Sequence, residues 1–130
     1  MRDCVAVVSP TEKWPVSAPA EVVRRLMEAF NGRDRDGFLG LLADDVEFRT
    51  PMGTAMHGLA AAKEFWRANE EQGVFVEQDG AQRVDGERVA LPTIMRMADG
   101  TELRCAGVFE ISDGKVAVFC VMMNRADVGL

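Results

Sequence analysis

The chain has 130 residues, of which 15 are Lys or Arg and 21 are Asp or Glu, so its formal net charge is −6. It contains one His and no Tyr, which excludes a phenolic general acid and every metal site that needs two imidazoles. The acidic balance would repel phosphate backbones, so nucleic acid is not expected as a partner. Length and composition fit one globular domain.

The three cysteines, Cys4, Cys105 and Cys120, are odd in number and widely spaced. They form neither a disulfide framework nor a metal-binding motif, so we expect a protein of the reducing cytoplasm without a bound metal. Nothing in the sequence predicts a cofactor. The apolar run Cys4–Val8 is too short for a signal peptide, and no segment approaches the roughly 18 apolar residues of a membrane span.

The N-terminal part divides into an arm and the start of a domain. Residues 1–17 are expected to form an arm because prolines interrupt regular structure there, and residues 18–130 to form the single domain. From Ala20 to Phe30 apolar residues recur at helical spacing, and the Asn-Gly pair at 31–32 is a stop signal. The first element is therefore predicted to be an amphipathic helix.

Three further elements precede the last third of the chain. A short helix is predicted over residues 34–43, with Asp34 as its N-cap. Val46–Thr50 alternates apolar and polar side chains with period two, which predicts a strand that ends before the following proline. A loop over residues 51–58 and a third helix over residues 59–72 complete this part.

Three Asp-Gly pairs recur in the last third at a spacing of 14 residues, at 85–86, 99–100 and 113–114. Asp-Gly between strand-like runs is a strong hairpin signal, because the turn needs positive φ. The pairs predict an antiparallel meander of four long strands, over residues 74–84, 88–97, 101–111 and 115–123. Asp79-Gly80 indicates a bulge in the first strand, and Pro92 requires an edge, a bulge or a later start in the second.

Helices that precede an antiparallel meander predict an α+β fold, in which the helices pack on one face of a curved, mostly antiparallel sheet. Long strands curled around a helix form a cone. A cone with an open end is a pocket, so the sequence predicts a binding cavity inside the curved sheet.

Several local strings, together with this order of elements, carry a family resemblance. The strings are Val22–Phe30 followed by Asn-Gly-Arg-Asp, Leu41–Phe48, His57-Gly58-Leu59 leading to Glu-Phe-Trp, and Gly107–Ile111 followed by Asp-Gly-Lys-Val. They resemble the NTF2-like (cystatin-like) superfamily, in particular its SnoaL-like branch, over residues 20–124. The resemblance implies the cone fold. Members include polyketide cyclases, ketosteroid isomerases and limonene-type epoxide hydrolases, so the fold alone does not select an activity.

The known catalytic residues of these relatives are absent. Ketosteroid isomerases carry a tyrosine and two acids at the positions that align with Leu26, Thr50 and Gly107. The residues that epoxide hydrolases need are missing as well, and the last strand has no acid where SnoaL-like cyclases place one. The resemblance therefore implies a retained scaffold without the known chemistries.

The facing pattern of the family implies which residues line the pocket. The expected lining residues are Leu26, Phe30, Phe48, Thr50, Phe65 or Trp66, Ile94, Arg96, Leu103, Cys105, Phe109, Phe119, Val121 and Met123. Asn124 ends the last strand, where its amide could orient a carbonyl. Residues 116–123 are apolar on both faces, so the second face is expected to be covered, and a two-fold dimer through the sheet would cover it.

Two residues are the candidates for catalysis. His57 is the only side chain with an ordinary pKa near neutrality, which makes it a candidate base, although the loop before the third helix also explains it structurally. Arg96 would stabilise a developing enolate if it faces inward, and it would face solvent if the strand register slips by one residue. Thr50 and Asn124 would orient the substrate.

Two functions remain open. The first is an isomerase, cyclase or dehydratase that acts next to a carbonyl of a small hydrophobic molecule, polyketide-, steroid- or terpenoid-like. The alternative is a non-catalytic dimeric module of the same fold that binds an apolar ligand or a partner protein.

Overall fold

The structure, a computed structural model, describes residues 18–49, 55–128 and 130. The predicted arm, residues 1–17, lies outside the described residues. The elements run in the order α1 (Ala18–Asn31), α2 (Arg35–Gly40), β1 (Leu42–Arg49), β2 (Ala55–His57), α3 (Gly58–Glu71), β3 (Phe75–Gln78), β4 (Arg83–Asp85), β5 (Arg88–Arg96), β6 (Glu102–Ser112), β7 (Lys115–Met122) and the 3-10 helix η1 (Arg125–Val128). No helix in the described part has the length and apolar character needed to span a membrane.

The three helices follow the predicted pattern closely. In α1 the apolar stripe is buried, with Val23, Leu26 and Phe30 at most 3% exposed. The N-cap of α2 is Asp34, as predicted, and its carboxylate accepts a hydrogen bond from the backbone N–H of Gly37 at 3.0 Å. The helix ends three residues earlier than predicted, because the chain turns directly into β1.

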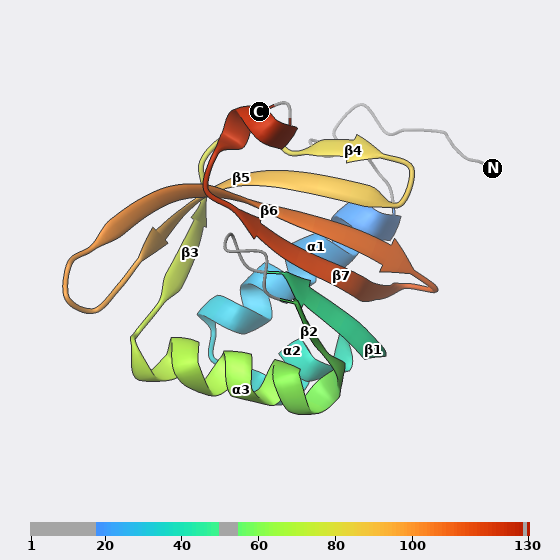
Figure 1. Cartoon of the computed structure of the whole chain (residues 1–130), viewed down its shortest axis with the longest axis horizontal. Helices are drawn as coiled ribbons and strands as arrows, with labels where there is room; N and C mark the ends of the chain where they lie inside the picture. Colours follow the sequence, from blue (N-terminus) through green and yellow to red (C-terminus); the bar gives the residue numbers. More distant parts are fainter. Residues whose placement is uncertain (1–17, 50–54, 129) are drawn as a thin grey trace.

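The strands form one curved sheet in the order β2-β1-β7-β6-β5-β3, with β4 also pairing with β5. Every neighbouring pair is antiparallel except β1 and β7, which are parallel. Figure 1 shows the long strands β5, β6 and β7 curling together, with α1 crossing them and α3 lying below. The prediction of an α+β fold with a curved, mostly antiparallel sheet is confirmed.

The three Asp-Gly hairpins are confirmed. Gly86, Gly100 and Gly114 have φ values of 61°, 92° and 74°, in the left-handed region that favours glycine. They connect β4 to β5, β5 to β6, and β6 to β7. The turns therefore set the register of the meander, as the sequence predicts.

The first strand of the meander differs from the prediction. Residues 74–84 form two strands, β3 and β4, separated at Asp79-Gly80. Pro92 lies in β5 opposite this gap, between the β3 pair that ends at Thr93 and the β4 pair that begins at Ala90. A proline lacks the N–H that a central strand position would use. Pro92 has no partner residue in β3 or β4, so it lies at a local edge of the sheet, which is one of the three alternatives that the sequence left open.

Candidate functional site: an apolar cavity on the concave face

An aromatic cluster joins the helices to the concave face of the sheet. Phe65 of α3 stacks on Phe38 and Phe48, with ring centroids 6.3 and 5.0 Å apart, and lies 5.4 Å from the ring of Phe119. Trp66 packs 5.1 Å from Phe38 and is 3% exposed. Phe65 is only half-buried, so it stands between this core and the open space beside it.

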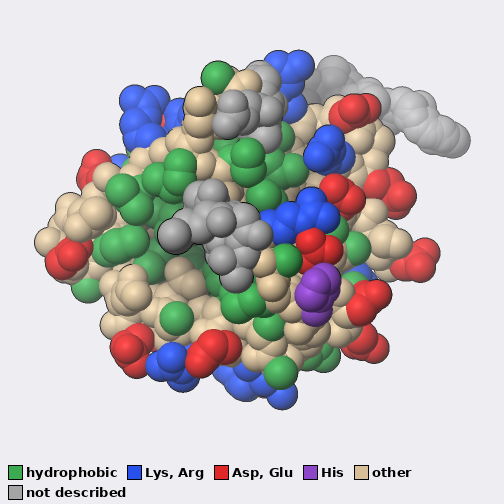
Figure 2. Space-filling view, viewed as in Figure 1, with side chains coloured by type: hydrophobic (Ala, Val, Ile, Leu, Met, Phe, Trp, Pro, Cys, Tyr) green, Lys and Arg blue, Asp and Glu red, His purple; other side chains and the backbone are tan. Residues whose placement is uncertain are grey.

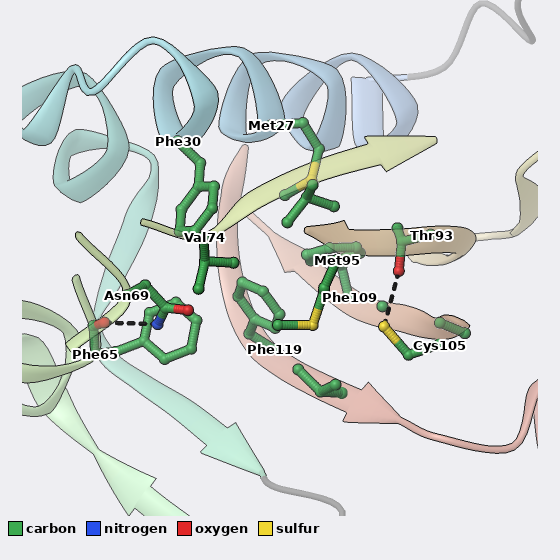
Figure 3. Close-up of a pocket in the computed structure, with 14 residues that line it drawn as sticks. Met27, Phe30, Phe65, Asn69, Val74, Thr93, Met95, Cys105, Phe109 and Phe119 are labelled. Carbon is green, nitrogen blue, oxygen red and sulfur yellow. Dashed lines mark hydrogen bonds between the residues drawn. The ribbon is translucent and has the colours of Figure 1, made fainter. Parts of the chain in front are cut away.

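The open space is an apolar cavity of about 420 Å³, part of it open to solvent. Side chains from α1 and α3 and from four strands converge on it (Figure 3). Figure 2 shows hydrophobic side chains gathered around a hollow on this face. The residues that line it are Met27, Phe30, Phe65, Asn69, Val74, Val76, Thr93, Met95, Cys105, Ala106, Gly107, Phe109, Phe119 and Val121.

Three lining side chains carry polar atoms. Thr93 is 4% exposed, and its hydroxyl lies 3.2 Å from the thiol of Cys105, with which it shares a hydrogen bond. The side-chain N–H of Asn69 donates to the backbone carbonyl of Phe65 at 2.7 Å, and Figure 3 shows both of these bonds. None of the described lining residues is an acid, a histidine, a lysine or an arginine. The cavity offers hydrogen-bonding groups but no carboxylate or imidazole for proton transfer.

The structure brings six of the expected lining residues to the cavity. Phe30 comes from α1, Phe65 from α3, and the others from β6 and β7: Cys105, Phe109, Phe119 and Val121. Leu26, Phe48 and Trp66 are at most 3% exposed and belong to the core beneath the cavity instead. Thr50 lies outside the described residues.

The expected orientation of β5 is wrong by one residue. Thr93 and Met95 line the cavity, so Ile94 and Arg96 face the outer side of the sheet. Arg96 is exposed, and its guanidinium pairs with Glu77 of β3, at 2.6 Å, and with Glu102 of β6. The alternative that the sequence left open, an outward-facing Arg96, is the one observed.

The candidate base, His57, and the end of the last strand also lie away from the cavity. His57 ends β2 opposite Glu47 and is exposed at the start of α3, where its side chain makes no capping hydrogen bond. Met123 is 47% exposed. Asn124 is exposed too, and its side-chain oxygen accepts from the N–H of Ala126 at the start of η1. The structure therefore does not bring His57 and Arg96 together.

The sequence contained a usable signal for some of the cavity-lining residues that our prediction did not include. Thr93 and Met95 lie two residues apart on β5, on one face, and Thr93 and Cys105 are direct cross-strand partners. Arg125 of η1 carried no signal, because it acts through contacts distant in sequence. Its guanidinium donates to the carbonyls of Thr93 and Cys105, at 2.8 and 3.0 Å, and to Asp79 at 2.9 Å. Arg125 therefore fixes the backbone beneath the Thr93–Cys105 pair.

The clearest electrostatic effects lie outside the cavity. The hydrogen bond from Arg24 holds the pKa of Glu21 below its ordinary value, and Arg49 lowers the pKa of Glu47 in the same way. Burial raises the pKa of the Cys120 thiol on the outer face of the sheet. Within the described residues, no three His, Cys, Asp or Glu side chains are grouped as a metal site would require.

Comparisons with solved structures agree with this fold. A computationally designed 17-OHP binder is 20% identical, with a TM-score of 0.75, and the match covers 85% of this chain and 93% of that one. TerC co-crystallised with polyporic acid is 22% identical, with a TM-score of 0.72 and coverage of 86% and 95%. A candidate polyketide cyclase from Xanthomonas campestris is 21% identical, with a TM-score of 0.71 and coverage of 85% and 93%.

At these identities the structural likeness shows the fold alone. A comparison with curated protein sequences gave no match. The SnoaL-like domain family matches residues 23–119, which include β1 to β6, the first part of β7 and most of α1. With most of its length matched in this way, the protein belongs to the SnoaL-like domain family.

Proposed function

We propose that residues 18–130 form a single domain that binds a small hydrophobic molecule, polyketide-, steroid- or terpenoid-like, in the cavity on the concave face. The observation that carries the proposal is the composition of the walls, which are apolar apart from Asn69 and the Thr93–Cys105 pair. Apolar walls with a few placed polar groups are typical of small-molecule sites. The designed 17-OHP binder and TerC with polyporic acid support it as structural relatives.

Binding without catalysis fits this cavity better than an isomerase, cyclase or dehydratase does. A reaction next to a carbonyl needs a base to move a proton. The described lining residues include no carboxylate or imidazole, and His57 and Arg96 are on the surface. Asn69 and Thr93 would orient a carbonyl or hydroxyl of the ligand without exchanging a proton.

The test is a fluorescence titration with 6-propionyl-2-(dimethylamino)naphthalene, a neutral apolar ketone. Val121→Phe places a ring in the cavity and should weaken binding by at least about 10-fold, because overpacking leaves no room for the probe. Val118→Phe is the matched control, since it makes the same change on the same strand but on the opposite face. The proposal is wrong if the wild-type protein binds no probe, or if the two variants lose affinity equally.

We also propose that the protein is a cytoplasmic homodimer formed through the sheet. Val118, Cys120 and Met122 of β7 lie on the outer face and are only partly buried. Arg49 and Glu47 flank them on β1 and pair with each other. A second copy related by a two-fold axis would cover this face. Cys105 and Cys120 are free thiols, which suits a reducing compartment.

A further inference from the structure

A second hollow adjoins the apolar cavity. It is a groove of about 600 Å³, open to solvent, between α1, β3 and the segment that precedes β4. Met27 and Val76 line both the groove and the cavity. Figure 3 shows Met27 reaching down from α1 on the cavity side of this shared wall. The residues that line the groove are Val23, Arg24, Met27, Glu28, Asn31, Val76, Gln78, Gln82 and Leu91.

Most polar groups of the groove already have partners. The guanidinium of Arg24 pairs with Glu21 and Glu28 on α1. The side chain of Asn31 donates to the carbonyl of Val76, at 2.7 Å, and accepts from the N–H of the same residue, at 2.9 Å. The backbone of β3 is therefore satisfied there, and α1 is fixed against the strand.

Two further amides line the groove, and they differ in one respect. The side-chain N–H of Gln78 donates to the carbonyl of Gly80 at 2.8 Å. The side-chain nitrogen of Gln82 is buried and has no hydrogen-bond partner in the described part of the chain. A buried donor without a partner costs free energy, so an acceptor brought by a ligand would gain a full hydrogen bond at this atom.

The surroundings select the kind of acceptor. Arg24 is already matched by two carboxylates, so the groove has no cation left to attract an anionic ligand. A neutral carbonyl or hydroxyl oxygen avoids the free-energy cost of burying a charge without a partner. Of the two residues that line both hollows, Met27 has a flexible side chain that adapts readily to different shapes.

We propose that the groove is a second compartment of the ligand site, reached past Met27, in which Gln82 donates a hydrogen bond to a neutral carbonyl or hydroxyl oxygen of the ligand. This inference rests on the proposed function. It adds the place of one polar group of the ligand: an apolar body fills the cavity, and one neutral oxygen lies at the α1–β3 end.

The experiment compares two probes that differ only in a carbonyl group, 6-propionyl-2-(dimethylamino)naphthalene and 6-propyl-2-(dimethylamino)naphthalene. Gln82→Met removes the donor and keeps the length of the side chain. This substitution should weaken binding of the ketone by about 5- to 10-fold and leave the affinity for the probe without the ketone unchanged. The emission of the bound ketone should also shift to the blue, because its carbonyl loses a hydrogen bond.

Gln72→Met is the matched control, because Gln72 is exposed after α3 and lines neither hollow. The inference is overturned if Gln82→Met weakens binding of both probes equally, because the effect then does not depend on the carbonyl. It is also overturned if binding of neither probe changes, because the amide then does not contribute to binding. If the wild-type protein binds the probe without the ketone and shows no preference for the ketone, the proposed function stands and the inference fails. If neither probe binds, the proposed function itself is wrong.

Discussion

Gly107 is the residue at which the floor of the cavity has no room for a side chain. A Cβ at this position would lie 2.9 Å from Cζ of Phe109 and 3.0 Å from its Cε1. The ring of Phe109 cannot easily withdraw, because it packs 4.8 Å from the ring of Phe119. The same residue stands where the ketosteroid isomerases that the sequence resembles carry an acid. Gly107 thus leaves the site without that acid and leaves room for the aromatic ring of Phe109.

Gly107→Ala should therefore destabilise the protein by about 1–2 kcal/mol, through displacement of the Phe109 ring. Urea denaturation followed by tryptophan fluorescence measures the loss. Gly40→Ala is the control, because a Cβ there meets no atom within 4 Å. An equal loss in both variants, or none at Gly107, would show that the ring is not held in place.

The residues expected to line the cavity coincide with its lining at Cys105 and Phe109 of β6 and at Phe119 and Val121 of β7, but not on β5. Strand side chains alternate with period two, so an error of one residue in register exchanges the two faces completely. Val116–Met122 is apolar on both faces, and Phe119 and Val121 could be assigned from the resemblance alone. Arg96 could not be oriented, because its partners Glu77 and Glu102 lie on neighbouring strands and give no local signal.

At the scale of elements, α1 carries a row of paired charged side chains on its exposed side. Arg24 lies between Glu21 and Glu28 and pairs with both, at the spacings that bring helix side chains together. Its hydrogen bond lowers the pKa of Glu21 below the ordinary value. A carboxyl with a depressed pKa stabilises the fold above its unfolded pKa, and this contribution disappears as the pH falls through the folded pKa.

Glu21→Gln should therefore lower the melting temperature at pH 7 by about 1–3 °C, and the difference should vanish below the folded pKa of Glu21. Thermal unfolding by circular dichroism at pH 7 and at successively lower pH values measures it. Glu70→Gln on α3 serves as the control for loss of one exposed charge. A difference that persists unchanged into acid would rule out the ion pair as its cause.

Elements defined by local signals were easier to predict than those defined by pairing. The Asn-Gly stop, the Asp34 cap and the Asp-Gly turns all use side chains or glycines that act within a few residues. Asp79-Gly80 marked an irregularity in the first meander strand but not its division into two strands, and the parallel pairing of β1 with β7 depends on residues far apart in sequence. No local pattern encodes such contacts.

At the scale of the whole molecule, the two faces of the sheet have different roles. The concave face holds the cavity and is closed by α1 and α3. On the outer face, Val118, Cys120 and Met122 are only partly buried, and Val108 beside them is 6% exposed. Burial raises the pKa of Cys120, against the opposing effect of Arg49 and Arg88 nearby. An apolar strip bordered by paired charges is suited to a second copy of the same surface.

Val118→Lys should convert the proposed dimer to a monomer, because two-fold symmetry would place both introduced ammonium groups in one apolar interface without partners. Sedimentation velocity at micromolar concentrations measures the change, and the probe titration checks that the cavity on the opposite face still binds. Lys63→Glu, an exposed charge change on α3, is the control and should leave the dimer intact. If the wild-type protein sediments as a monomer, or if Val118→Lys stays dimeric, the outer face is not the interface. A cavity that binds equally well in the dimer and in the monomeric variant would mean that each subunit carries a complete ligand site.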